Sequence, residues 1–309
     1  MNSTHFSFLV TDEIRRALKQ DQPVVALEST VITHGLPAPH NLRLARDMEA
    51  GVRSRGAIPA TVALLNGSIH IGLTDSELES LASNPAIKVS LRDFATALTK
   101  KINGGTTVAG TMFAAHKIGI KVFATGGIGG VHKESRMDIS TDMQALATLP
   151  VIVVCAGAKS ILDLPSTLEL LETNGVPVLG YGTDEFPAFF SRHSGLKVSA
   201  RVDSPQEVAD FVRAHWSLGL QSGILVCQPI SAEFEISREE IDPIEEQASQ
   251  EAIERGIRGQ AVTPFLLRRV NELSDGRSTR ANISFLLNNA RLAADIAKAM
   301  TAPIKTRSL

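Results

Sequence analysis

The chain has 309 residues, of which 43% are hydrophobic, 21% are charged and 5% are aromatic, and its formal net charge is −2. This balance argues against a nucleic-acid-binding protein, which needs a basic field and aromatic stacking platforms. The two cysteines form no disulfide framework, and no apolar run approaches the roughly 18 residues of a membrane span. We therefore expect a cytoplasmic protein that has no signal peptide and no membrane partner.

Short apolar runs alternate with helical patterns over most of the chain. The predicted strands are Val24–Leu27, Ala60–Leu65, Ser68–Ile71, Lys88–Leu91, Lys121–Thr125, Val151–Cys155, Val176–Leu179, Lys197–Arg201 and Gly223–Cys227. Predicted helices include Asn41–Arg55, Thr107–Lys117, Ser140–Ala147 and Pro205–Leu218. Asn66-Gly67 predicts a hairpin turn, and Ser204 before Pro205 predicts a helix N-cap. The alternation predicts an α/β fold with a mostly parallel central sheet flanked by helices on both faces.

The segment after Ser237 changes character and is predicted to be largely helical. Residues Glu239 to Arg258 are charged and amphipathic, and Asn282 to Met300 have the pattern of a long final helix. The chain contains no low-complexity linker and no internal repeat. We therefore favour a single domain over residues 1–309 with a helical C-terminal part, rather than two domains.

One lysine follows a predicted buried strand. The run Val151–Cys155 leads into Ala-Gly-Ala-Lys-Ser, which places Lys159 just past the carboxyl end of that strand. Ligands of open α/β sheets bind at this edge. A lysine held there in apolar surroundings loses proton affinity and becomes an amine nucleophile toward a sugar or keto carbon. The alternative is a solvated lysine without a catalytic role.

Two further features follow predicted strands. Residues 126–130 contain four glycines, whose backbone can approach a phosphate or sugar closely; a flexible turn is the alternative. Their spacing matches neither the P-loop nor the dinucleotide fingerprint. Glu28 leaves the strand Val24–Leu27, where desolvation would raise the pKa of its carboxyl as a general acid requires. A surface ion pair is an equally good interpretation of Glu28.

Polar residues elsewhere allow both structural and functional interpretations. Asp138 or Ser140 is expected to cap a helix, or Asp138 holds Mg²⁺ or Mn²⁺ through one direct ligand and several waters. Lys88 either reaches a phosphate or is solvated. Gly104–Val108 predicts a loop that feeds a helix N-terminus, which is a ready anion site. Asn282 in the final helix offers its amide either to a pyrimidine edge or to neighbouring loops.

With these motifs assembled, the chain resembles the pseudouridine-5′-phosphate glycosidase family, also named after indigoidine synthase A. The resemblance runs over nearly the whole chain, from Val24 to Met300. The matching strings are Ala26-Leu27-Glu28-Ser29-Thr30, Lys88-Val89-Ser90, Thr106-Thr107-Val108-Ala109, Phe123 to His132, Asp138-Ile139-Ser140-x-Asp142, Val153 to Leu164, and Thr263-Pro264-Phe265-Leu266-Leu267.

The resemblance implies a lyase of the hydro-lyase class that reversibly cleaves the C–C glycosidic bond of pseudouridine 5′-phosphate to uracil and ribose 5-phosphate. It implies that Lys159 is the nucleophile and forms an imine with ring-opened ribose, and that Glu28 is the proton donor. Asp138 is implied as the ligand of one mostly water-coordinated Mn²⁺ per subunit, and the expected assembly is a homotrimer. Implied substrate contacts are Lys88, Thr107, Val108, Thr125, His132, Ser140, Thr141, Asp142 and Asn282.

Two other functions stay open from the sequence. A lysine-dependent aldolase acting on sugar phosphates would use Lys159 in the same way but would not need Asn282. A non-catalytic sugar-phosphate sensor would keep the glycine loop without the chemistry. It would bind ribose 5-phosphate but release no uracil from pseudouridine 5′-phosphate.

Overall fold

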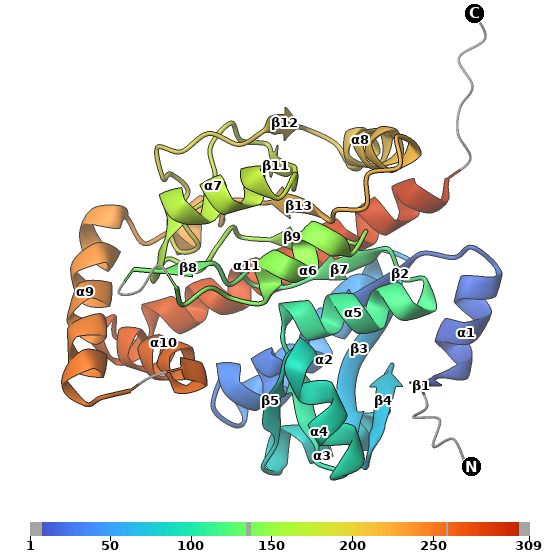
Figure 1. The fold of residues 1–309 in the computed structure, drawn as a ribbon, viewed down its shortest axis with the longest axis horizontal. Coiled ribbons are helices and arrows are strands. Elements are labelled where there is room, and N and C mark those ends of the chain that lie inside the picture. Colours follow the sequence, from blue (N-terminus) through green and yellow to red (C-terminus); the bar gives the residue numbers. More distant parts are fainter. Residues whose placement is uncertain (1–7, 134–136, 258, 303–309) are drawn as a thin grey trace, which may run out of the picture.

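A single large sheet runs through the molecule (Figure 1). The computed structural model describes residues 8–133, 137–257 and 259–302. The strand order is β1-β4-β3-β2-β7-β9-β13-β11-β12; the short strand β6 also pairs with β3, and β5 pairs with β6. These strands are β1 (Phe8–Val10), β2 (Val24–Leu27), β3 (Ile58–Leu65), β4 (Ser68–Ile71), β5 (Ile87–Val89), β6 (Gly104–Thr106), β7 (Val122–Ala124), β9 (Ile152–Cys155), β11 (Val178–Tyr181), β12 (Ala200–Val202) and β13 (Ile224–Cys227). A separate pair joins β8 (Val131–His132) to β10 (Leu162–Asp163).

The neighbouring strands of the large sheet are parallel except where β3 meets β4 and β6. Every residue of β2, β7, β9 and β13 is buried, so these strands are continuous apolar runs without alternation. Such runs occur where helices cover both faces of a parallel sheet. The predicted mostly parallel sheet is therefore confirmed.

Helices cover both faces of this sheet (Figure 1). The long helix α11 packs on β2, β7 and β9 beside α2 and α8, while α5, α6 and α7 cover the other face. The helices are α1 (Asp12–Lys19), α2 (His40–Ser54), α3 (Asp75–Ser83), α4 (Phe94–Thr99), α5 (Val108–Ile118), α6 (Asp142–Thr148), α7 (Leu164–Thr173), α8 (Pro205–Ser217), α9 (Arg238–Glu254), α10 (Val262–Leu273) and α11 (Arg277–Thr301). Among the described residues, none of the helices is both long enough and apolar enough to traverse a bilayer.

Several local predictions are confirmed. The strands β2 and β4 have the predicted bounds. Asn66 and Gly67 connect β3 to the antiparallel β4 with φ angles of 51° and 82°, as a turn with two left-handed positions requires. The Ser204 hydroxyl accepts the Glu207 N–H at 3.2 Å and so caps α8.

Several boundaries were predicted wrongly; strands β11 and β12, for example, span Val178–Tyr181 and Ala200–Val202 rather than Val176–Leu179 and Lys197–Arg201. Residues Gly104–Thr106 form strand β6 rather than a loop, because two glycines remove the side-chain pattern by which a strand is recognised. Helix α6 begins at Asp142 rather than Ser140, and the Ser140 hydroxyl accepts the Asp142 N–H at 3.2 Å from outside the helix. The final helix begins at Arg277, before the expected Asn282, because the preceding residues are also compatible with helix.

Candidate active site

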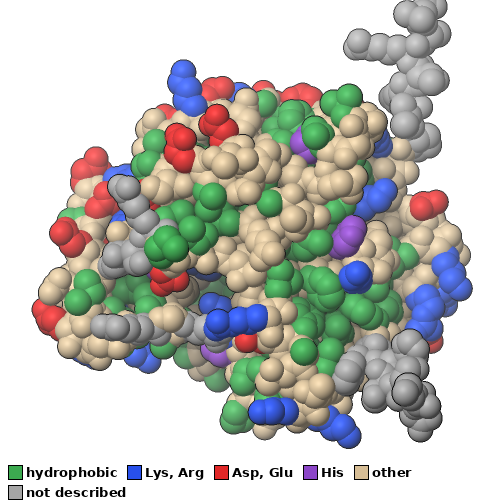
Figure 2. Space-filling model, in the orientation of Figure 1, with side chains coloured by type: hydrophobic (Ala, Val, Ile, Leu, Met, Phe, Trp, Pro, Cys, Tyr) green, Lys and Arg blue, Asp and Glu red, His purple; other side chains and the backbone are tan. Residues whose placement is uncertain are grey.

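A cavity of about 360 Å³ opens at the carboxyl ends of the central parallel strands. The neighbouring strands β2, β7 and β9 lead, in that order, to the cavity-lining residues Glu28, Gly126 and Lys159. Figure 2 shows a recess on this face, left of the centre, with Lys or Arg side chains at its edge. Because parallel strands end at one edge of the sheet, residues far apart in sequence meet there.

All but one of the site residues predicted from the sequence line this cavity. They are Glu28, Lys88, Thr107, Val108, His132, Asp138, Ser140, Thr141, Asp142, Lys159 and Asn282. Thr125 is the exception, because its side chain is fully buried behind Glu28. We therefore interpret Thr125 as a residue that holds Glu28, in contrast to the expectation that it touches the substrate.

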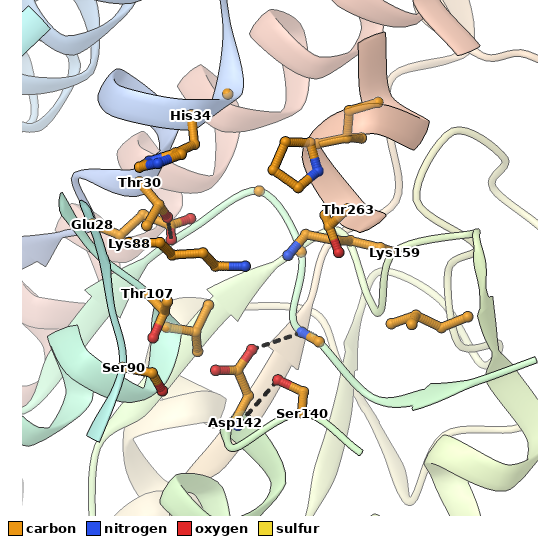
Figure 3. Close-up of a pocket in the computed structure, with 18 of the residues that line it drawn as sticks. Glu28, Thr30, His34, Lys88, Ser90, Thr107, Ser140, Asp142, Lys159 and Thr263 are labelled. Carbon is orange, nitrogen blue, oxygen red and sulfur yellow. Dashed lines mark hydrogen bonds between the residues drawn. The ribbon is translucent and has the colours of Figure 1, made fainter. Parts of the chain in front are cut away.

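Two amines face each other across the cavity. Lys88 reaches in from β5 and Lys159 from the loop after β9, and their Nζ atoms point toward one another (Figure 3). The pKa of Lys88 is lowered, first by desolvation and then by the charge of Lys159. Repulsion from the Lys159 ammonium group therefore favours the neutral form of Lys88.

Glu28 is held by two hydroxyl groups. Thr30 donates to Glu28 Oε2 at 2.7 Å, and Thr125 donates to Glu28 Oε1. Burial raises the pKa of the Glu28 carboxyl, while Lys159 and the two hydroxyl groups oppose that rise. The expected direction of the shift is therefore confirmed. A carboxyl group with a raised pKa can hold a proton near neutral pH and deliver it as a general acid.

Behind Glu28, one asparagine fixes the backbone. Asn289 Nδ2 donates to the carbonyl oxygen of Thr125 at 2.8 Å, and Asn289 is fully buried on α11. Helix α11 therefore contributes to the site in two ways. Asn289 holds the backbone at Thr125, and Asn282 lines the cavity.

Asp142 ties two segments of the cavity wall together. Its Oδ1 accepts the Ala109 N–H at 2.9 Å, and its Oδ2 accepts the Gly129 N–H at 2.8 Å (Figure 3 shows the second bond). The side chain is 5% exposed. Although Asp142 lines the cavity, both of its oxygens already have backbone partners. Its position joins the N-terminus of α5 to the glycine loop.

The glycine loop is tightly packed rather than a flexible turn. A Cβ at Gly127 would lie 2.6 Å from the Phe189 ring, and one at Gly126 would lie 3.0 Å from the Phe285 ring. Lys159 N–H donates to Ile128 O at 3.1 Å, so the loop runs directly alongside the segment that carries the lysine. The glycines are needed for this close approach of two backbones.

Asp138 lies exposed at the rim of the cavity, and its backbone carbonyl accepts the His132 N–H at 3.0 Å. Within the described part of the chain, no three His, Cys, Asp or Glu side chains gather as a metal cage. A single rim carboxylate fits a hard divalent cation that keeps most of its waters. It does not fit a dehydrated ion held by protein ligands alone.

Several cavity-lining residues were not predicted. Thr30 and Ser90 lie in matching strings but were given no role, and Thr263 brings the start of α10 to the cavity opposite Lys88 (Figure 3). His34 comes from the π-helical turn η1 (Val31–Gly35), and its pKa is lowered by desolvation and then by Lys88. No local chemical pattern marks His34, because only the fold turns it toward the amines.

The comparisons with known proteins find similarity along nearly the whole chain. A family model described as indigoidine synthase A like protein matches residues 13–299. A relative from Solibacter usitatus named pseudouridine-5′-phosphate glycosidase is 54% identical over 291 residues, which cover 93% of this chain and 97% of the relative. A relative of the same name from Paracoccus denitrificans is 55% identical over 296 residues, covering 94% and 97%.

Two solved structures share the fold. The prealnumycin C-glycosynthase AlnA, solved in complex with ribulose 5-phosphate, superposes with a TM-score of 0.87 at 39% identity, covering 95% of this chain and 97% of that chain. An indigoidine synthase A-like protein from Thermotoga maritima superposes with a TM-score of 0.89 at 35% identity, covering 98% and 99%.

Proposed function

The chain belongs to the family of indigoidine synthase A-like proteins, and we propose that it reversibly cleaves the C–C glycosidic bond of pseudouridine 5′-phosphate to uracil and ribose 5-phosphate. The observation that carries this proposal is the placement of the Lys159 amine and the Glu28 carboxyl in one cavity. The name shared by the curated relatives supports the substrate. The structural relative AlnA, a C-glycosynthase in complex with ribulose 5-phosphate, supports C-glycosidic chemistry on a pentose phosphate.

The bond to be broken explains the need for an amine. In pseudouridine the base is joined through carbon, so uracil cannot leave as a protonated nitrogen base. The two-carboxylate route of ordinary glycosidases passes through an oxocarbenium-like transition state as the leaving group departs. A uracil carbanion would leave poorly by that route. A covalent amine adduct instead divides the reaction into easier steps.

In the proposed reaction the neutral amine of Lys159 attacks C1′. The bond from C1′ to the ring oxygen breaks, and the ring oxygen takes a proton from Glu28 to become a hydroxyl group. The Lys159 nitrogen, now an ammonium group, returns a proton to the Glu28 carboxylate and so regains its lone pair. That lone pair then forms the C1′ iminium as the bond to uracil C5 breaks, and C5 takes the proton from Glu28. Water hydrolyses the imine to ribose 5-phosphate and restores the amine.

Glu28 is suited to carry these protons. Burial favours its protonated form, while the hydroxyl groups of Thr30 and Thr125 remain as donors to the carboxylate that follows proton transfer. The same group can therefore give a proton to the ring oxygen and recover it from water. Its hydrogen bonds limit its rotation in both states.

The remaining cavity residues supply charge and polar contacts for the substrate. The N-terminus of α5 at Thr107 and Val108, together with Lys88 and His132, suits the phosphate and sugar hydroxyl groups. Asn282 offers one amide donor and one acceptor to the edge of uracil. The apolar side chains of Pro264 and Leu267 on α10 limit access of water from the opposite wall.

We further propose one Mn²⁺ per subunit, held directly by Asp138 and otherwise by waters. When bound, such an ion supplies positive charge to the phosphate and orders water at the rim. We also propose a cytoplasmic homotrimer, consistent with the family resemblance. Sedimentation would show the mass of three chains, and a monomer at working concentration would contradict that assembly.

The reaction is tested by following uracil release in the ultraviolet from pseudouridine 5′-phosphate, with and without added Mn²⁺. We expect equal amounts of uracil and ribose 5-phosphate, and faster release with Mn²⁺ in an otherwise metal-free buffer. Binding of ribose 5-phosphate without any uracil release would contradict the reaction and favour a sensor. Unchanged kinetics in Asn282→Ala would contradict the uracil contact and favour an aldolase.

A further inference from the structure

One carboxyl group occupies a core position on a helix outside the cavity. The buried residues of α9 recur at helical spacing as Ile241, Glu245, Ala248 and Ala252, and Glu245 is 1% exposed. An apolar residue is expected at such a position, because burying a carboxyl group costs free energy unless hydrogen bonds compensate. Burial raises the pKa of Glu245 to about 7.

The partner of this carboxyl group is the residue next to the lysine. Ser160 Oγ donates a hydrogen bond to Glu245 Oε1 across 85 positions of sequence, and Ser160 is itself buried. Glu245 Oε2 has no hydrogen-bond partner in the described part of the chain. The hydrogen bond from Ser160 is therefore the contact that offsets the free-energy cost of burying the Glu245 carboxyl group.

The nearby charged groups are engaged elsewhere or exposed. Arg238 and Asp242 on α9 pair with each other at 2.9 Å, and Lys133 is exposed. All three influence the pKa of Glu245, but Ser160 has the larger effect after burial. Glu245 is thus directed toward the lysine loop rather than toward an ion pair of its own.

The loop that carries Lys159 has two kinds of attachment. Its backbone is fixed to the glycine loop, because Lys159 N–H donates to Ile128 O at 3.1 Å. Its side-chain attachment is the Ser160 hydroxyl, which reaches α9 through Glu245. Since the lysine side chain has four rotatable bonds, the position of Nζ depends on a well-fixed backbone.

We propose that Glu245 is a positioning residue: by accepting the hydrogen bond of Ser160 it fixes the loop that presents Lys159 to the substrate. This inference rests on the proposed function, in which Lys159 attacks C1′. Helix α9 also packs on α10, which brings Thr263 to the same cavity. Helix α9 therefore fixes the position of the lysine loop relative to α10.

The test compares Glu245→Met with Glu245→Gln, two side chains of similar size. Glutamine keeps a strong oxygen acceptor for Ser160, whereas methionine offers only a weakly accepting sulfur. We expect Glu245→Gln to keep kcat within about threefold, because the hydrogen bond that orients the loop is retained. We expect Glu245→Met to lower kcat by about 10- to 100-fold with KM changed less than about twofold, since small misplacement of a reacting group acts on kcat. The rate of borohydride trapping of ribose 5-phosphate should fall in parallel with kcat.

Ser160→Ala removes the donor and serves as the second variant if Glu245→Met does not fold. It should show the same loss of kcat, and the double variant should be no slower than either single one, because both remove one interaction. Wild-type kcat in a folded Glu245→Met or in Ser160→Ala would overturn the inference. Fully additive losses of kcat in the double variant would also overturn it.

Failure of the proposed function is recognised separately in the wild-type protein. If it releases no uracil but still traps ribose 5-phosphate at Lys159, the proposed glycosidase activity is wrong. The trapping rates of the variants then decide the role of Glu245. A wild-type protein that neither releases uracil nor traps ribose 5-phosphate contradicts both proposals.

Discussion

Glu28 combines two opposing influences in one side chain. Burial raises the pKa of its carboxyl, while Thr125, Thr30 and the charge of Lys159 favour the ionised form. If Glu28 is the proton donor, the rate should fall as pH rises through its pKa, because the ionised carboxylate has no proton to give. The descending limb of the pH profile therefore reports on this residue.

Thr125→Val changes this balance without changing the size of the side chain. It removes a donor to the carboxylate, so the pKa of Glu28 should rise and the descending limb of kcat against pH should move to higher pH. Glu28→Gln should abolish that limb and lower kcat by about 10²- to 10⁴-fold. A descending limb that stays in place in Thr125→Val would assign it to another group.

Single site residues could be predicted from the sequence where they directly follow a predicted strand. Lys159 and Glu28 each follow an apolar run, and both line the cavity. Thr125 also ends a predicted strand, but only the fold shows that its side chain turns toward Glu28 rather than toward the cavity. Glu245 lies on an amphipathic helix, where an acidic residue usually faces water, so no local pattern indicates its burial.

At the scale of elements, the glycine loop and the segment 156–160 act as one packed unit. Gly127 lies against the ring of Phe189, which is held in a left-handed backbone conformation with a φ of 61° and packs on Phe190 and Phe285. The aromatic cluster supports the loop from behind. Because both sides are filled, the loop has no room for a side chain.

Gly127→Ala should therefore destabilise the protein by about 1–3 kcal/mol, because a Cβ would meet the Phe189 ring at 2.6 Å. The matched control is Gly51→Ala in the last turn of α2, where a Cβ would have ordinary contact with Arg291 at 3.7 Å. Gly51→Ala should stabilise the protein by about 0.5–1 kcal/mol, because alanine has a higher helix propensity than glycine. Urea unfolding measures both, and equal effects in the two variants would contradict the packing argument.

Element types were easier to predict than their limits. The apolar runs that became β2 and β9 were evident because buried parallel strands lack polar interruptions. Strand β6 was missed because its glycines carry no pattern, and its pairing with β3 and β5 depends on residues distant in sequence. The role of α10 as a cavity wall follows from its packing against α9 and α11, which sequence periodicity does not specify.

At the scale of the whole molecule, the order of strands creates the site. The sequence order is β2, β7, β9, and these three strands are also neighbours in the sheet, although a hairpin and several helices separate β2 from β7 in the chain. Their carboxyl ends bring Glu28, the glycine loop and Lys159 together. We propose that residues 1–309 form one domain, because the site takes residues from Glu28 to Leu286 and the helix α11 packs across the central strands.

The central claim is that Lys159 forms an imine with ribose. The direct measurement is borohydride reduction of the protein in the presence of ribose 5-phosphate, followed by peptide mass mapping. Lys88 faces the same cavity. Under the proposed assignment of Lys159 as the nucleophile, we expect one stable adduct on Lys159, and none in a folded Lys159→Ala variant. An adduct on Lys88, or no adduct while uracil release continues, would contradict the account.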